Sequence, residues 1–321
     1  MPPMITDAHQ LAPFIRRDWL MMGNGQQLHL AQYGNPQGIP LLYLHGGPGA
    51  GASVSELSLF NPEHYWILLL DQRGAGQSLP AGELEHNHLN GLISDIEAIR
   101  IHLGIERWCL AGGSFGATLA LIYSGLFPHR VIAQVLWAVF IPSKAGIEWL
   151  YAPSGAAKLY PQAYCEFAAP SIGLADLFTH YQLGFNAQDE ATRHEFARRW
   201  IQWELTLAGV PIGLPKRLAA PLLALAQIEL HYAKNDYFNM FSVLQRVTSQ
   251  VTARTLLLQG TQDAVCPARL LAAFLAKIDN PRIQIHTIVD GGHSLNSDIL
   301  SLAVTLEIQA MWAWIKRQEL A

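Results

Sequence analysis

Residues 108–126 read WCLAGGSFGATLALIYSGL, and this stretch decides the fold. The apolar residues 108–111 are typical of a buried strand, and residues 117–126 have the apolar content of a buried helix. Between them, Gly-x-Ser-x-Gly places Ser114 on a tight turn, where glycines at 112 and 116 avoid steric clashes. A glycine turn between strand and helix, or a phosphate-binding loop, is the alternative, but the strand–turn–helix setting favours a nucleophilic serine.

The same rhythm of strand and helix extends in both directions along the chain. Residues 92–103 and 300–317 have the pattern of helices, and this alternation predicts a mostly parallel, doubly wound sheet. The turn residues NPQG at 35–38 predict a hairpin between the strand on each side. Strands are predicted at residues 27–33, 40–44, 65–70, 108–111, 131–139, 255–259 and 283–289.

After Pro142 the sequence changes in character. Residues from about 143 to 250 are mostly helical in pattern, rich in Trp, Tyr and Phe, and interrupted by prolines. We therefore predict a core formed by residues 1–142 and 251–321, with a helical cap inserted at 143–250.

Composition excludes several classes of protein. The chain has 321 residues, of which 50% are hydrophobic and 14% charged, so it can bury a large core. A net charge of −4 without a Lys/Arg run argues against nucleic-acid binding. The three cysteines are widely spaced, and they form neither a disulfide framework nor a metal pattern. No signal peptide is evident, and the most apolar stretch, residues 131–141, is too short to cross a membrane. We therefore expect a cytoplasmic protein that needs no metal or cofactor; its oligomeric state stays open.

A general base and an acid follow the last two predicted strands. His293 lies in a glycine loop (GGHS, 291–294), and Asp263 ends the segment GTQD. The order Ser114, Asp263, His293 is that of a catalytic triad on this kind of sheet. Asp290 is the alternative acid, but it lies so near His293 in sequence that we expect it to shape the loop.

Two further loops follow predicted strands. The segment HGGPG (45–49) can present the backbone N–H of Gly47 to a developing oxyanion, together with that of Phe115. A plain glycine-rich connection is the alternative. In DQRGAGQS (71–78), we expect Asp71 and Arg73 to hold the loops around the site by charge-assisted hydrogen bonds.

With these residues in place, the chain resembles the proline iminopeptidases, serine peptidases of the α/β-hydrolase fold. The resemblance covers nearly the whole predicted core, and it implies that fold with an inserted helical cap. The matching stretches are HGGPGAG (45–51), DQRGAGQS (71–78), HLGIERWCLAGGSFGATLALIY (102–123), GTQDAVCP (260–267) and GGHS (291–294).

The predicted cap matches the family too. RWIQWE (199–204) and IELHY (228–232) resemble two of its segments, and the resemblance implies that Glu204 and Glu229 bind the substrate's free α-amino group. Buried carboxylates suit an ammonium, whereas solvated helix residues are the alternative. The resemblance also implies that Phe140 belongs to an aromatic proline pocket.

Four positions depart from the family pattern. Phe115 stands where Trp is common, Ala233 where an aromatic residue is usual, and Trp137 where Arg is typical. Leu150 occupies a position that is often Tyr. The residues therefore support cleavage after an N-terminal residue more strongly than they support the identity of that residue.

The function predicted from the sequence is that of a serine aminopeptidase. It would release an N-terminal residue, proline or a similar small or apolar one, from a peptide or an aminoacyl small molecule through an acyl-enzyme. An esterase, lactonase or amidase with the same triad is the alternative enzyme. A non-catalytic ligand-binding protein on the same scaffold is the alternative outside enzymes, and the complete set of Ser, Asp and His argues against it.

Overall fold

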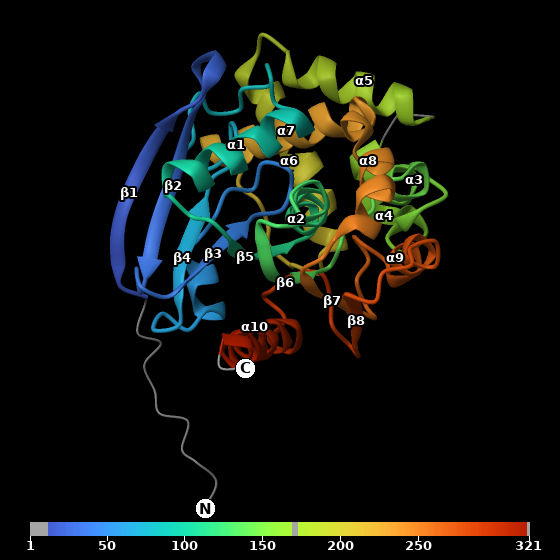
Figure 1. Ribbon diagram of the computed structural model, residues 1–321. Coiled ribbons are helices and arrows are strands. Elements are labelled where there is room, and N and C mark those ends of the chain that lie inside the picture. Colours follow the sequence, from blue (N-terminus) through green and yellow to red (C-terminus); the bar gives the residue numbers. More distant parts are fainter. Residues whose placement is uncertain (1–11, 169–172, 320–321) are drawn as a thin grey trace, which may run out of the picture.

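An eight-stranded sheet runs through the molecule, with helices on both faces (Figure 1). The computed structural model describes residues 12–168 and 173–319. The strand order is β1-β2-β4-β3-β5-β6-β7-β8, and of these strands only β2 runs against the others. The prediction of a mostly parallel, doubly wound sheet is confirmed.

The strands lie where the apolar runs predicted them, within one or two residues for most ends. They are β1 (Phe14–Met21), β2 (Gln27–Gly34), β3 (Ile39–Leu44), β4 (Tyr65–Leu70), β5 (Trp108–Gly113), β6 (Val131–Trp137), β7 (Arg254–Gly260) and β8 (Ile283–Ile288). The sequence analysis did not predict β1. It is an edge strand with charged residues and without a buried position, so its pattern lacks the apolar signal of a core strand.

The predicted hairpin between residues 27–33 and 40–44 is wrong. The turn forms, with the N–H of Gly38 donating to the carbonyl of Asn35, but β2 pairs with β1 and β4 instead of β3. Strand β3 lies between β4 and β5 and is parallel to both. Its leucines are fully buried, which suits an interior position with parallel neighbours and not the place beside an antiparallel hairpin partner.

Two apolar clusters form the core, one on each face of the sheet. On one face, α1 (Leu89–His102), α2 (Phe115–Leu126) and α9 (Ala268–Leu275) pack against the strands. On the other face lie α10 (Asp298–Glu319) and the short helix η2 (Val54–Leu59). In Figure 1, α10 lies on the side of the sheet opposite to α1 and α7.

Between β6 and β7 the chain is helical. It forms α3 (Lys144–Tyr151), η3 (Ala156–Lys158), α4 (Pro161–Ala168), α5 (Leu174–Phe185), α6 (Glu190–Leu207), α7 (Ala220–Lys234), η4 (Asp236–Asn239), α8 (Met240–Val247) and η5 (Thr248–Gln250). Helix α8 contacts α2, so the last part of this region packs on the core. The division at residues 143 and 250 stays a prediction.

Within residues 12–168 and 173–319, one helix, α10, is long and apolar enough to cross a bilayer by length and composition alone. Its inward side chains are buried against the sheet: Leu300, Val304 and Ile308 have no exposed surface. Such an amphipathic arrangement is that of a helix covering a sheet in the core of a globular fold.

Candidate active site

The predicted site residues converge at one edge of the sheet, where the parallel strands end. Ser114 follows β5, Phe140 follows β6, Asp263 follows β7 and His293 follows β8, while Gly47 lies in the loop after β3. In open α/β sheets this edge is the usual place for a ligand site.

Ser114 has φ 55° and ψ −124°, a conformation that L residues rarely adopt. The turn is tight enough that a Cβ on Gly116 would lie 2.0 Å from the carbonyl oxygen of Leu44, and one on Gly112 would lie 2.8 Å from the same oxygen. The two glycines of the motif are therefore required by close backbone approach, as the sequence analysis expected.

Asp263 and His293 form a hydrogen-bonded pair. The Nδ1 atom of His293 lies 3.0 and 3.1 Å from the two carboxylate oxygens, and the Asp263 side chain is fully buried. The backbone N–H groups of Val265 and Cys266 also donate to this carboxylate, at 3.0 and 2.8 Å. Asp290, the alternative acid, is exposed and makes no hydrogen bond to His293 among the described residues.

Burial alone would lower the pKa of the His293 imidazole. The Asp263 carboxylate acts in the opposite direction, helped by the charge of Glu204, and the net effect raises the pKa of His293 above its ordinary value of 6.5. This arrangement holds one imidazole nitrogen on the acid and leaves the other free for a substrate or a hydroxyl.

Ser114 and His293 line the same cavity. In the described part of the chain no hydrogen bond joins the Ser114 hydroxyl to the imidazole; the thiol of Cys266 is a side-chain hydrogen-bond neighbour of that hydroxyl instead. Hydrogen bonds between catalytic groups are often long before substrate binds, so this geometry is compatible with a serine–histidine pair.

The potential ligand atoms of Asp263, Cys266 and His293 lie within 4.8 Å of one another. A metal would need the cysteine as thiolate, but burial raises the pKa of the Cys266 thiol, and Asp263 raises it further. The chemistry of this group therefore favours a histidine held by its carboxylate over a metal centre.

The two expected oxyanion donors lie near Ser114: Phe115 is the next residue, and Gly47 lines the same cavity. The N–H groups of Gly47 and Phe115 make no hydrogen bond to any described residue, so both are available to a ligand. Gly47 has φ +102°, and a Cβ there would lie 2.7 Å from the backbone nitrogen of Gly49, which restricts the position to glycine.

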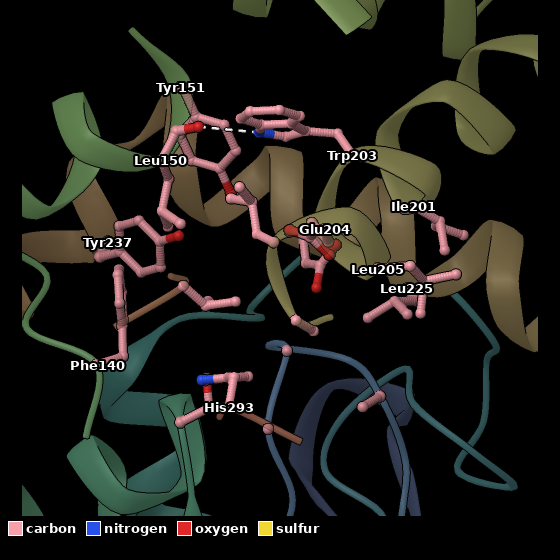
Figure 2. A pocket seen from close by; sticks show the side chains of 18 residues that line it. Phe140, Leu150, Tyr151, Ile201, Trp203, Glu204, Leu205, Leu225, Tyr237 and His293 are labelled. Carbon is pink, nitrogen blue, oxygen red and sulfur yellow. Dashed lines mark hydrogen bonds between the residues drawn. The ribbon is translucent and has the colours of Figure 1, made fainter. Parts of the chain in front are cut away.

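Glu204 on α6 and Glu229 on α7 line the cavity above Ser114. The indole N–H of Trp200 donates to the Glu229 carboxylate at 2.9 Å, and the two glutamates are themselves hydrogen-bonded neighbours. Figure 2 shows Glu204 across the cavity from His293.

The surroundings of Glu204 and Glu229 disfavour the state in which both carboxyl groups are ionised. Burial raises the pKa of Glu204 to about 7, although hydrogen bonds from Glu229 and Trp200 favour its charged form. Burial also raises the pKa of Glu229 well above its usual range, and the neighbouring Glu204 adds to this effect. A bound cation would relieve the mutual repulsion, so the pair suits an ammonium group.

The cavity has a volume of about 240 Å³ and is mostly apolar. Figure 2 shows Phe140, Tyr151 and Tyr237 on one side of Glu204 and aliphatic side chains on the other, with Trp203 above Glu204. The aromatic side consists of Phe140, Tyr151 and Tyr237, with Leu150; the aliphatic side includes Ile201, Leu205 and Leu225.

Comparison with known proteins agrees with this geometry. Residues 39–298 match the family described as alpha/beta hydrolase fold. The proline iminopeptidase of Arabidopsis thaliana is 35% identical over 303 residues, covering 92% of this chain and 79% of the relative. That of Xanthomonas citri is 34% identical over 283 residues, covering 86% and 90%. The chain belongs to the proline iminopeptidase family.

Solved structures show the same fold. The proline iminopeptidase of Mycobacterium smegmatis superimposes with a TM-score of 0.58 at 16% identity, covering 94% of this chain and all of that one. The proline iminopeptidase-related protein of Thermus thermophilus gives 0.55 at 21% identity, covering 93% and 99%. A thioesterase domain from the curacin pathway is equally similar, with a TM-score of 0.59, so these likenesses establish the fold alone.

Within this α/β-hydrolase fold, three of the four departures do not line the cavity: Phe115, Trp137 and Ala233 are all buried outside it. The ring of Trp137 stacks on Tyr43 in the core, at 6.3 Å between centroids, and Ala233 is buried outside the cavity lining. Phe140, Leu150 and the Glu pair line the cavity as expected.

The sequence analysis missed three aromatic residues that line the cavity, Tyr151, Trp203 and Tyr237. Tyr237 is presented by a left-handed turn in which Asp236, Tyr237, Phe238 and Asn239 all have positive φ, from 47° to 60°. Without glycine, such a turn has no sequence signature, since L residues avoid this conformation. The Tyr237 ring packs on the Phe140 ring, with 4.9 Å between the centroids. Figure 2 shows the hydroxyls of Tyr151 and Tyr237 pointing into the cavity.

Asp71 and Arg73 hold the surrounding loops, as predicted. The Asp71 carboxylate accepts hydrogen bonds from the N–H groups of Ala52 and Gln77, at 2.7 and 2.9 Å. Arg73 forms a buried ion pair with Asp95 on α1. Neither side chain lines the cavity, so both act on loop geometry.

Proposed function

We propose that this protein is a serine aminopeptidase that releases the N-terminal residue of peptides through an acyl-enzyme. One observation carries the proposal: a single cavity holds Ser114 and His293 at one wall and two carboxyl groups, those of the half-buried Glu204 and the buried Glu229, at another. A hydrolase without an amine to recognise has no use for Glu204 and Glu229 in a mostly apolar cavity, because removing two carboxyl groups from water is costly.

The chemistry follows from the roles of the loop residues. Rotation of the Ser114 hydroxyl towards His293 lets the imidazole accept its proton while the oxygen attacks the substrate carbonyl. The N–H groups of Gly47 and Phe115 stabilise the oxyanion, and Asp263 stabilises the imidazolium. His293 then protonates the leaving amine, and water hydrolyses the acyl-enzyme by the same route.

Glu204 and Glu229 bind the substrate ammonium. One proton shared by the pair leaves one negative charge at neutral pH, which matches the single positive charge of an N-terminal amine. Because both groups lie deep in the cavity, a peptide with a further residue before this amine would place an uncharged amide there. The site therefore accepts only one residue between the free amine and the scissile bond.

The aromatic side of the cavity receives the side chain of that residue. Phe140, Tyr151 and Tyr237 form walls for a small or apolar group such as the proline ring, and Leu150 completes them. We propose a cytoplasmic location, which the three free cysteines support because an oxidising compartment favours disulfides.

The test is the variant Glu204→Gln on two substrates, prolyl-naphthylamide and a simple acyl ester without an amine. The proposal predicts that kcat/KM for the aminoacyl substrate falls about 100-fold, while ester hydrolysis changes by no more than about threefold. Glu85→Gln, whose side chain is 80% exposed, is the matched control. Equal loss on both substrates, or no loss, would contradict amine binding and favour an esterase, lactonase or amidase.

A further inference from the structure

We infer that a groove between the end of α6 and the His293 loop binds the part of the peptide that follows the scissile bond, and that it selects against acidic residues there. The inference rests on the proposed peptidase function. It concerns the leaving half of the substrate, which the triad and the glutamate pair do not bind.

The groove has a volume of about 540 Å³ and adjoins the catalytic cavity. The two share Leu207 and Ala208 as walls, and the groove is bordered by Gly292 and Ser294, the residues on each side of His293. Its lining residues are Tyr160, Leu207, Ala208, Gly209, Val210, Pro211, Ile212, Gln262, Asp290, Gly292, Ser294, Asn296 and Ser297.

The position of His293 determines where the leaving chain goes. The imidazole must lie beside the leaving nitrogen in order to protonate it, so the peptide after that nitrogen passes the His293 loop. The catalytic cavity, at about 240 Å³, is smaller than the range of about 300–1,000 Å³ typical of pockets that enclose a whole ligand. It can hold the first residue, but the following chain needs the adjoining groove.

The groove is built on fixed loops. The N–H of Gln262 donates to the carbonyl of Gly291 at 2.9 Å, and the N–H of Asp290 donates to the Thr261 hydroxyl at 2.9 Å. These bonds join the loop after β7 to the loop after β8. On the opposite wall, Gly209 with φ +69° ends α6 and turns residues 210–212 along the groove.

The lining suits a peptide backbone with neutral or basic side chains. Gln262 and Asn296 offer amide groups, and Ile212, which is 52% exposed, offers apolar surface. Among the described residues that line the groove, Asp290 carries the only full charge. A carboxylate at this position attracts a lysine or arginine side chain and repels a glutamate or aspartate.

The experiment compares kcat/KM for prolinamide, Pro-Ala-Ala-Ala, Pro-Ala-Lys-Ala and Pro-Ala-Glu-Ala. Asn296→Trp fills the groove from an exposed position. We expect it to lower kcat/KM for Pro-Ala-Ala-Ala, relative to kcat/KM for prolinamide, about tenfold. Gln284→Trp, on the edge strand β8 outside the groove, is the matched control and leaves this ratio as in the parent enzyme.

Asp290→Asn gives an independent test, because asparagine tolerates the left-handed φ of 58° at this position. It should reduce the preference for Pro-Ala-Lys-Ala over Pro-Ala-Glu-Ala about threefold. An unchanged peptide-to-amide ratio in Asn296→Trp, or an unchanged lysine-to-glutamate preference in Asp290→Asn, would overturn the inference. If prolinamide itself is not hydrolysed by the parent enzyme, the proposed peptidase function fails instead.

Discussion

Asp263 and Asp290 follow neighbouring strands, yet only one of them has the surroundings of a catalytic acid. Asp263 is fully buried, accepts two backbone N–H groups and faces His293. Asp290 is exposed and lies in the groove beside the site. The sequence order of strand, acid and histidine was sufficient to predict this choice, because the carboxyl ends of adjacent parallel strands meet.

Asp263→Asn should lower kcat on prolyl-naphthylamide by about 10⁴-fold, since the amide presents its N–H to the imidazole and stabilises the wrong tautomer. Asp290→Asn should cost far less. Steady-state kinetics on both variants, with circular dichroism to confirm folding, decide between the two acids. A larger loss in Asp290→Asn than in Asp263→Asn would assign the role to Asp290.

The pH dependence of ester hydrolysis reports on the pKa of His293, to which the charge of Glu204 contributes, because an ester without an amine does not involve the glutamate pair in binding. The imidazole must be neutral to accept the Ser114 proton, so activity falls as pH decreases through its pKa. Since the pKa of His293 is raised, the acidic limb of kcat/KM should have its midpoint above 6.5. A midpoint below that value would mean that burial outweighs Asp263.

Among the elements, α6 and α7 illustrate how much a helix pattern can and cannot predict. The sequence indicates helices here, and the family resemblance implies that one glutamate on each points inwards. The left-handed turn after α7, which brings Tyr237 to the cavity, could not be predicted because its residues favour other conformations. Similarly, the hairpin prediction failed because turn residues specify a reversal of the chain but not which strand becomes the neighbour.

The pair of carboxyl groups between α6 and α7, Glu204 and Glu229, should also make the free energy of unfolding depend on pH. A buried carboxyl with a raised pKa stays protonated in the folded protein while the unfolded chain ionises. The folded state therefore loses stability as pH rises from the ordinary carboxyl value of 4.5 through about 7.

Glu229→Gln keeps an acceptor for Trp200 and removes one ionisable group of the pair. We expect its Tm to exceed that of the parent by ~2 °C or more near pH 8, and this advantage to shrink near pH 5. Differential scanning calorimetry at the two pH values measures the difference. If the Tm difference stays constant or grows towards acidic pH, repulsion between the two ionised glutamates does not destabilise the folded protein.

For the molecule as a whole, the central claim is that three loops distant in the sequence meet at one point. Strands β5 and β7, which precede the Ser114 and Asp263 loops, are buried apolar runs and were therefore readily predicted from the sequence, whereas β8, which precedes the His293 loop, alternates and is mostly exposed. The residues of the helical region between β6 and β7 that shape the cavity, and the edge strand β1, were less predictable because packing rather than local pattern places them.

Covalent labelling with a fluorophosphonate, followed by mass spectrometry of the digested protein, tests this claim most directly. The reagent reacts with a serine only when a base and an oxyanion site activate it. We predict one adduct, on the peptide containing Ser114, which is absent in Ser114→Ala and forms at least ~100-fold more slowly in His293→Ala. Labelling at another residue, or an equal rate without the imidazole, would contradict the convergence of Ser114, Asp263 and His293 on a single active site.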